Sequence, residues 1–134
     1  MYLQADEPKL NGLGSTAVPL TPKHSAGVVA MWERHGSGRV GLELYYTGKQ
    51  SLENNPYRMQ SDPYRQVRLL GELVMGRFSI FVNLENLLDV RQTRKDSLLL
   101  PARSPLGLWT VDAWAPLEGF IANVGFRLRI GANQ

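Results

Sequence analysis

The sequence predicts an all-β fold, an antiparallel up-and-down sheet with the strand and loop lengths of a transmembrane β-barrel segment. Two observations lead to this prediction. Five stretches alternate apolar and polar residues with a period of two, as strands with one apolar face do. The connections between these stretches alternate between tight turns and long loops, which is typical of outer-membrane barrels.

The first two predicted strands span residues 25–34 and 39–48. In the first, Ala26, Val28 and Trp32 lie on one face, and in the second every even-numbered position from Val40 to Tyr46 is apolar. The segment between them, "HGSG", supplies glycine for a tight hairpin turn. These two stretches therefore predict a β-hairpin.

The third and fourth predicted strands span residues 64–75 and 78–86, and "GR" joins them by a second tight turn. Long segments, 49–63 and 87–119, join the second strand to the third and the fourth to the last, residues 120–130. A loop as long as 87–119 is unusual in a compact soluble domain unless it is functional, but it is expected outside a membrane barrel. Met1–Gln4 could end a preceding, sixth strand.

The alternation predicts a lipid-facing exterior and a water-filled lumen. A soluble sheet with one face on a core alternates in the same way, so the loop lengths, rather than the alternation, favour the membrane. The predicted exterior comprises Val40, Leu42, Leu44, Tyr46, Val67, Leu69, Leu73, Ile80, Val82, Leu84, Phe120, Val124, Phe126, Leu128 and Ile130. The predicted lumen-facing residues are Glu43, Arg68, Glu72, Asn83, Glu85, Asn123, Arg127 and Arg129.

Composition and charge exclude several classes of protein. The 134 residues suit one domain, and 43% hydrophobic residues argue against disorder. With no cysteine, a disulfide scaffold, a cysteine–zinc site and a thiol nucleophile are excluded. The net charge of +3 is scattered without a basic run, so we expect no nucleic-acid partner. The N-terminal residues lack the pattern of a signal peptide, and no apolar stretch is long enough for a transmembrane helix.

Several segments of the chain resemble a known family when read together. They are "VPLTPKHSAGVVAMWE", "GRVGLELYYTGKQSLENNPYR", "FVNLENLLDVRQT" and "DAWAPLEGFIANVGFRLRI". They are similar to the C-terminal end of TonB-dependent outer-membrane receptors, in which a Pro-x-His segment leads into a strand. An Asn-Leu-x-Asp motif closes the penultimate strand of that family, here Asn86 to Asp89, and a Pro-Leu-x-Gly segment precedes the last, here Pro116 to Gly119.

The resemblance covers residues 18–130 and implies a bacterial outer-membrane location and a transport function. The family's barrel has 22 strands and an N-terminal plug, and it takes up chelates, vitamins or sugars with energy passed on by TonB. We therefore expect residues 1–134 to be the C-terminal part of such a barrel. The implied partners are outer-membrane lipid, the remaining strands and plug of the same receptor, and TonB, which the missing N-terminal part would contact.

The candidate functional residues lie in the longest loop. Asn86 and Asp89 are predicted to form side-chain-to-backbone turns where the strand meets the loop. Cations and indoles cluster beyond them and could contact an anionic ligand, although an ordinary solvated loop explains them as well. This cluster contains Arg91, Arg94, Lys95, Arg103, Trp109 and Trp114.

No catalytic or cofactor pattern is present, so the sequence predicts no enzyme, no cofactor and no metal site. His24 and His35 lack a metal-ligand spacing, and no Gly-x-Ser-x-Gly elbow occurs. Two alternatives stay open. One is a soluble antiparallel barrel or curved sheet that binds an apolar ligand. The other is a truncated gene product without a function of its own.

Overall fold

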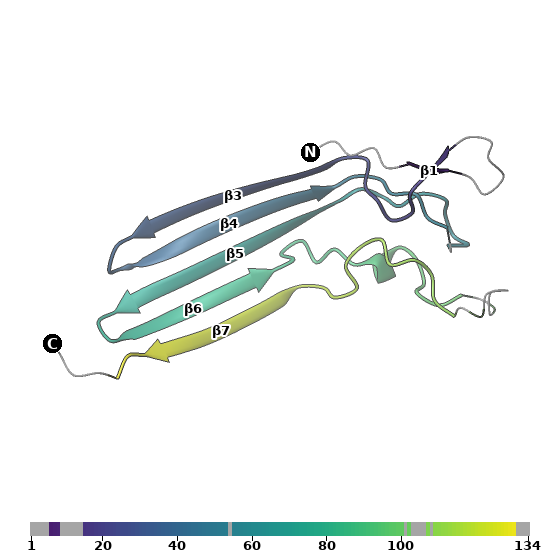
Figure 1. Ribbon diagram of the computed structural model, residues 1–134. Helices are drawn as coiled ribbons and strands as arrows, with labels where there is room; N and C mark the ends of the chain where they lie inside the picture. The colour runs from purple at the N-terminus through teal and green to yellow at the C-terminus, as the bar shows by residue number, and fades with distance from the viewer. Residues whose placement is uncertain are drawn as a thin grey trace. The chain divides into compact units, whose positions relative to one another are not determined.

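A computed structural model describes residues 6–8, 15–53, 55–100, 102, 107 and 109–130. Five strands form one antiparallel up-and-down sheet in the order β3-β4-β5-β6-β7 (Figure 1). Neighbours along the chain are thus neighbours in the sheet, and the predicted all-β antiparallel fold is confirmed. The strands are β3 (Ser25–Arg34), β4 (Gly38–Thr47), β5 (Tyr64–Met75), β6 (Phe78–Glu85) and β7 (Ile121–Leu128).

The strand bounds follow the alternation closely. β3 and β5 have the predicted bounds, β4 begins and ends one residue earlier than predicted, and β6 ends one residue earlier. β7 ends at Leu128, two residues before the predicted end, so Ile130 lies just beyond the strand. Periodicity therefore locates the strands well, and the errors are confined to their ends.

Glycines make both tight turns, as predicted. Gly36 has a φ of 73° and Gly76 a φ of 61°, in the left-handed region where a side chain is disfavoured. Both turns lie at the same end of the sheet (Figure 1).

Three short elements were not predicted. β1 (Asp6–Pro8) and β2 (Ser15–Ala17) pair as a separate two-stranded sheet, and the 3-10 helix η1 (Gln92–Arg94) lies within the longest loop. Three residues are too few to show a period in the sequence. The additional strand expected near Met1–Gln4 falls outside the described residues.

The chain forms two compact units. The sheet unit comprises Gly27–Tyr45, Gln66–Asp89 and Phe120–Gln134, and the loop unit comprises Met1–Ala26, Tyr46–Arg65 and Val90–Gly119. The buried hydrophobic residues of the described chain are Val111, Trp114 and Ala115, and all three belong to the loop unit. The hydrophobic core of the described residues is therefore in the loops and not in the sheet.

Candidate functional site

The apolar side chains predicted to share one face do share it in β5, β6 and β7. Leu73 pairs with Ile80, and Ile80 pairs in turn with Phe126. Val82 lies between Gly71 of β5 and Val124 of β7 in the same way. Because side chains alternate between the faces of a strand, this register aligns all the apolar positions on one side of the sheet. We call this side the apolar face.

The apolar face is uncovered. Val124 and Phe126 are each 73% exposed, and Trp32 of β3 is 63% exposed. Members of the predicted exterior set in β4 are exposed as well, whereas Val67, Leu69, Val82 and Leu84 are partly buried by their neighbours. Soluble monomers rarely leave a continuous apolar surface of this kind open to water.

The opposite side, which we call the polar face, carries paired charges. Arg39 Nε lies 3.0 Å from Glu72 Oε2, and Arg127 Nη1 lies 3.9 Å from the other oxygen of the same carboxylate. Arg68 Nη1 lies 3.8 Å from Glu43 Oε2. Four charges of the predicted lumen-facing set, on β4, β5 and β7, thus form ion pairs across the strands, together with Arg39, which was not in that set.

Glycines on the polar face lie beneath large side chains of the neighbouring strand. A β-carbon at Gly125 would overlap the ring of Phe81, its partner in the ladder. A β-carbon at Gly41 would lie 3.0 Å from Leu70 Cδ2. Gly27 lies beneath Tyr45 in the same way, so the polar face is filled close to its backbone.

The two outer strands of the sheet have free edges. Within the described residues, β3 pairs only with β4 and β7 only with β6. Each therefore presents one row of backbone N–H and C=O groups without a strand partner, which is the usual site for adding another strand.

The loop unit is built around a buried tryptophan. Trp114 is 3% exposed, and its Nε1 donates a hydrogen bond to Asp96 Oδ2 at 3.2 Å. The guanidinium carbon of Arg58 lies 5.3 Å from the centre of the Trp114 ring. Arg58 also contacts both oxygens of Asp96, with Nε 2.7 Å from Oδ2 and Nη2 2.8 Å from Oδ1. A bidentate ion pair and a cation–π contact thus join the two long loops.

Gln92 connects the same loops through a fully buried side chain. Its Nε2 donates to the carbonyl of Asp112 at 2.8 Å, and its Oε1 accepts from the Trp114 amide at 2.8 Å. Gln50, in the other long loop, donates to the Trp114 carbonyl at 3.0 Å. The side chains of these two buried glutamines therefore hold the loops together through paired polar groups.

Charge pairing changes two pKa values in the loop unit. A hydrogen bond from Lys95 lowers the pKa of Asp62, opposed by partial burial and reinforced by Arg58. Burial would lower the pKa of Arg58, but its hydrogen bonds to Asp96 and Asp62 outweigh this effect, so the pKa is raised. Both groups therefore keep their charges over the ordinary pH range.

The chain turns at Asn86 and Asp89, where side-chain-to-backbone bonds were predicted, and the hydrogen bond across this turn joins backbone groups. Both residues have left-handed backbones, with φ of 50° and 51°, and the Asp89 amide donates to the Asn86 carbonyl at 2.7 Å. Asp89 Oδ1 also accepts from the Phe120 amide at 3.1 Å. One aspartate side chain thus connects the two ends of the longest loop at the start of β7.

The loop residues predicted to contact a ligand differ in their exposure. Trp114 is inside the loop unit, Lys95 pairs with Asp62 at 2.8 Å, and Trp109 is 59% exposed. Arg94 is exposed, Arg91 is partly buried, and Arg103 lies outside the described residues. The sequence missed Arg58, Asp96 and Gln92, because no spacing along the chain connects them with Trp114.

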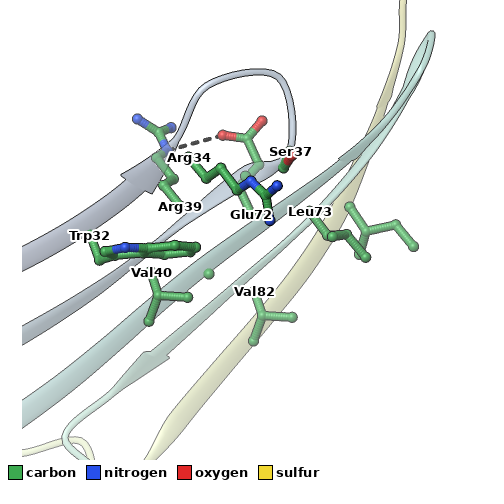
Figure 2. Close-up of a pocket in the computed structure, with 11 residues that line it drawn as sticks. Trp32, Arg34, Ser37, Arg39, Val40, Glu72, Leu73 and Val82 are labelled. Carbon is green, nitrogen blue, oxygen red and sulfur yellow. Dashed lines mark ion pairs between the residues drawn. The ribbon is translucent and has the colours of Figure 1, made fainter.

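A hollow of about 420 Å³ opens on the apolar face near the tight turns (Figure 2). Its apolar lining is formed by Trp32, Val40, Gly71, Leu73, Ile80 and Val82. Arg34 and Ser37 lie on its rim beside the β3–β4 turn. Sequence reasoning missed this hollow as well, and Gly71 within an apolar alternation was the available signal.

Comparison with protein-family models, with curated proteins and with solved structures found no match to the chain. Among the described residues, no group of three His, Cys, Asp or Glu side chains could hold a metal ion. In that part of the chain, no helix is long and apolar enough to cross a membrane. The sheet, its two faces and its edges are therefore the features that bear on function.

Proposed function

We propose that the sheet is part of the wall of an outer-membrane β-barrel, in a TonB-dependent receptor that takes up a chelate or another small nutrient. The observation that carries this proposal is the single-layered sheet with an open apolar face and ion pairs on its other face. Bilayer lipid covers the apolar face in this arrangement, and water fills the space beside the polar face. The protein is then a transporter component rather than an enzyme.

Burial of the apolar face supplies the driving force. Each Å² of apolar surface removed from water contributes about 25 cal/mol, so an open face of large side chains such as Leu44, Val124 and Phe126 needs a covering medium. β3, β4 and β5 have 10, 10 and 12 residues, which suits tilted strands that cross the hydrocarbon layer. Lipid requires no further protein layer on this side.

The free edges of β3 and β7 support the presence of further strands. In hydrocarbon, an unpaired backbone group costs several kcal/mol, so a barrel wall must continue until it closes. The resemblance to TonB-dependent receptors supplies the identity of these partners: the other strands and the plug of the same receptor, with TonB acting on the plug side. The alternation of tight turns and long loops supports the same proposal.

The test exploits the absence of cysteine from the sequence. Val124→Cys and Asn123→Cys each create a single labelling site on opposite faces of β7, one residue apart. The full chain, labelled with an environment-sensitive fluorophore, is reconstituted in phospholipid vesicles that contain nitroxide-labelled lipid. We expect strong quenching at position 124 and weak quenching at position 123.

A second measurement separates the membrane from a soluble fold. The chain is expected to aggregate without detergent and to become monodisperse with β-sheet circular dichroism when detergent is added. A soluble monomer that melts cooperatively without detergent would overturn the proposal and favour the soluble binder of an apolar ligand. Equal quenching at the two labelled positions would also overturn it.

A further inference from the structure

The hollow on the apolar face combines two kinds of surface. Its floor consists of Trp32, Val40 and Val82, with Leu73 and Ile80 beside them, and its rim carries the cationic side chain of Arg34 (Figure 2). Arg34 ends β3 on the same face as Trp32, since the two are two residues apart in one strand. A volume of about 420 Å³ falls within the range of small-ligand sites.

Gly71 opens the hollow. The glycines on the polar face are each covered by a neighbouring side chain, whereas a β-carbon at Gly71 would meet nothing within 4 Å. Its φ lies outside the left-handed region, so the backbone does not require glycine at this position. Glycine inside a strand often marks a place where a ligand approaches closely.

The charges beside the hollow are not equivalent. Arg39 forms an ion pair with Glu72 at 3.0 Å, on the polar face. In the described part of the chain, the guanidinium of Arg34 has no ion pair, so its charge is available to an anion. Arg34 is also exposed, and it lies at the end of the sheet where both tight turns occur.

We propose that this hollow binds an anionic phospholipid, with one acyl chain over Gly71 and the phosphate at Arg34. An apolar groove that ends at an unpaired cation matches an amphiphile with an anionic head in both shape and charge. The inference rests on the proposed function, because it requires the apolar face to meet a bilayer. The bound lipid belongs to the leaflet on the tight-turn side of the sheet.

The experiment uses Trp32 as a reporter. The full chain in detergent micelles is titrated with phosphatidylglycerol or phosphatidylcholine carrying brominated acyl chains, which quench indole fluorescence on contact. The Trp32→Phe variant gives the signal of the other two tryptophans, and subtraction isolates Trp32. We expect saturable quenching with an affinity for phosphatidylglycerol about fivefold above that for phosphatidylcholine, the factor for one cation at a membrane surface.

Two variants separate the acyl and phosphate contacts. Gly71→Leu fills the hollow and should lower the affinity for both lipids about tenfold. This factor corresponds to about two methylene groups that are no longer buried. Arg34→Gln should remove the preference for phosphatidylglycerol and leave phosphatidylcholine unchanged. Gly71→Ala, with a smaller side chain, gives the same test in a milder form if the leucine variant misfolds.

Matched controls lie elsewhere on the sheet. Val124→Leu adds a methylene to the apolar face outside the hollow, and Arg129→Gln removes an equal charge beyond the end of β7. Neither variant should change the affinity of the hollow for the two lipids, or its preference between them, as reported by Trp32. Their circular dichroism should match that of the parent chain.

The outcomes are distinct. Quenching of Trp32 that does not saturate and is insensitive to Gly71→Leu and Arg34→Gln would mean general lipid contact. That result overturns the phospholipid site and leaves the membrane placement intact. A soluble chain whose Trp32 is quenched by neither lipid would overturn the proposed function itself.

Discussion

The sheet unit and the loop unit place their apolar residues in opposite ways. In the loop unit Trp114 and Val111 are inside, and Gln92 and Asp96 are buried with their polar groups paired. In the sheet unit Val124 and Phe126 are exposed, as is nearly all of the apolar face of β3 and β4. The loops thus supply their own interior, whereas the sheet depends on whatever surrounds it.

The largest expected effect is the loss of a buried tryptophan, Trp114, compared with the loss of an exposed one, Trp32. Trp114→Ala should lower the free energy of unfolding of the loop unit by about 3–5 kcal/mol, because it empties the centre of that unit. Trp32→Ala, at a site 63% exposed, should change it by less than about 0.5 kcal/mol. The Ser61 amide donates to the Gln50 carbonyl in the loop unit, so its hydrogen-exchange rate measures the change in the free energy of unfolding in both variants. Equal losses would remove the distinction between the units.

The next effect tests the two faces of β7. In phospholipid vesicles, Val124→Arg should lower the free energy of unfolding by about 2–4 kcal/mol, as charges on a lipid-facing strand do. Asn123→Arg introduces the same side chain on the polar face and should cost much less. Urea unfolding followed by circular dichroism compares them. If Asn123→Arg were the costlier change, the assignment of the faces would be reversed.

A smaller effect concerns the hydrogen bonds of Gln92. Gln92→Ala leaves the Trp114 amide and the Asp112 carbonyl without their partners, at a cost of about 1–3 kcal/mol. Gln60→Ala, at an exposed position in the other long loop, should stay within about 0.5 kcal/mol of the parent chain. Faster exchange of the Trp114 amide in the first variant alone is the expected result. An unchanged rate would show that Gln92 does not hold the loop.

The smallest effect is the pH dependence from Asp62. Its pKa is lowered in the folded chain from the ordinary value of 3.8. The stability that it contributes is therefore complete above pH 3.8 and is lost as the pH falls through the lowered pKa. Because Asp62 is 39% exposed, solvent screening keeps this contribution small.

Asp62→Asn should therefore flatten the acid limb of the stability curve of the loop unit and leave its value at higher pH only slightly reduced. Asp112 is a poor control because its carboxylate accepts from the Glu53 amide, so the exposed Glu53→Gln variant, which keeps that amide, is used. Thermal melts between pH 2 and pH 6 compare the two variants. An acid limb as steep in Asp62→Asn as in the parent would contradict this role of the carboxylate.

The sequence predicted the sheet because its determinants are local. Alternation in β3 and β5 and the glycines at Gly36 and Gly76 act over a few residues, so the strands and tight turns were located correctly. The turn at Asn86 and Asp89 is local too, but its hydrogen bond joins backbone groups, and the Asp89 side chain accepts from the Phe120 amide far along the chain.

The interior of the loop unit could not be predicted in the same way. Arg58, Asp96 and Trp114 meet only after two long loops fold together, and no period or motif connects positions so far apart in the chain. The sequence analysis therefore predicted Trp114 as a ligand contact, although its ring is packed inside the loops. The hollow at Gly71 is lined by four strands at once and was missed for the same reason.

The glycines covered by side chains on the polar face also constrain the register between neighbouring strands. A shift of one residue between strands would exchange the two faces, but a shift of two would keep every apolar side chain on its own side. The ring of Phe81 distinguishes these alignments between β6 and β7, because Gly125 leaves room beneath it and Asn123 and Arg127 lie two residues away on either side. Leu70 over Gly41 does the same between β4 and β5. Both pairs of strands are joined by long loops, which do not fix the register as a tight turn does. The covered glycines therefore help to fix the register of these two pairs.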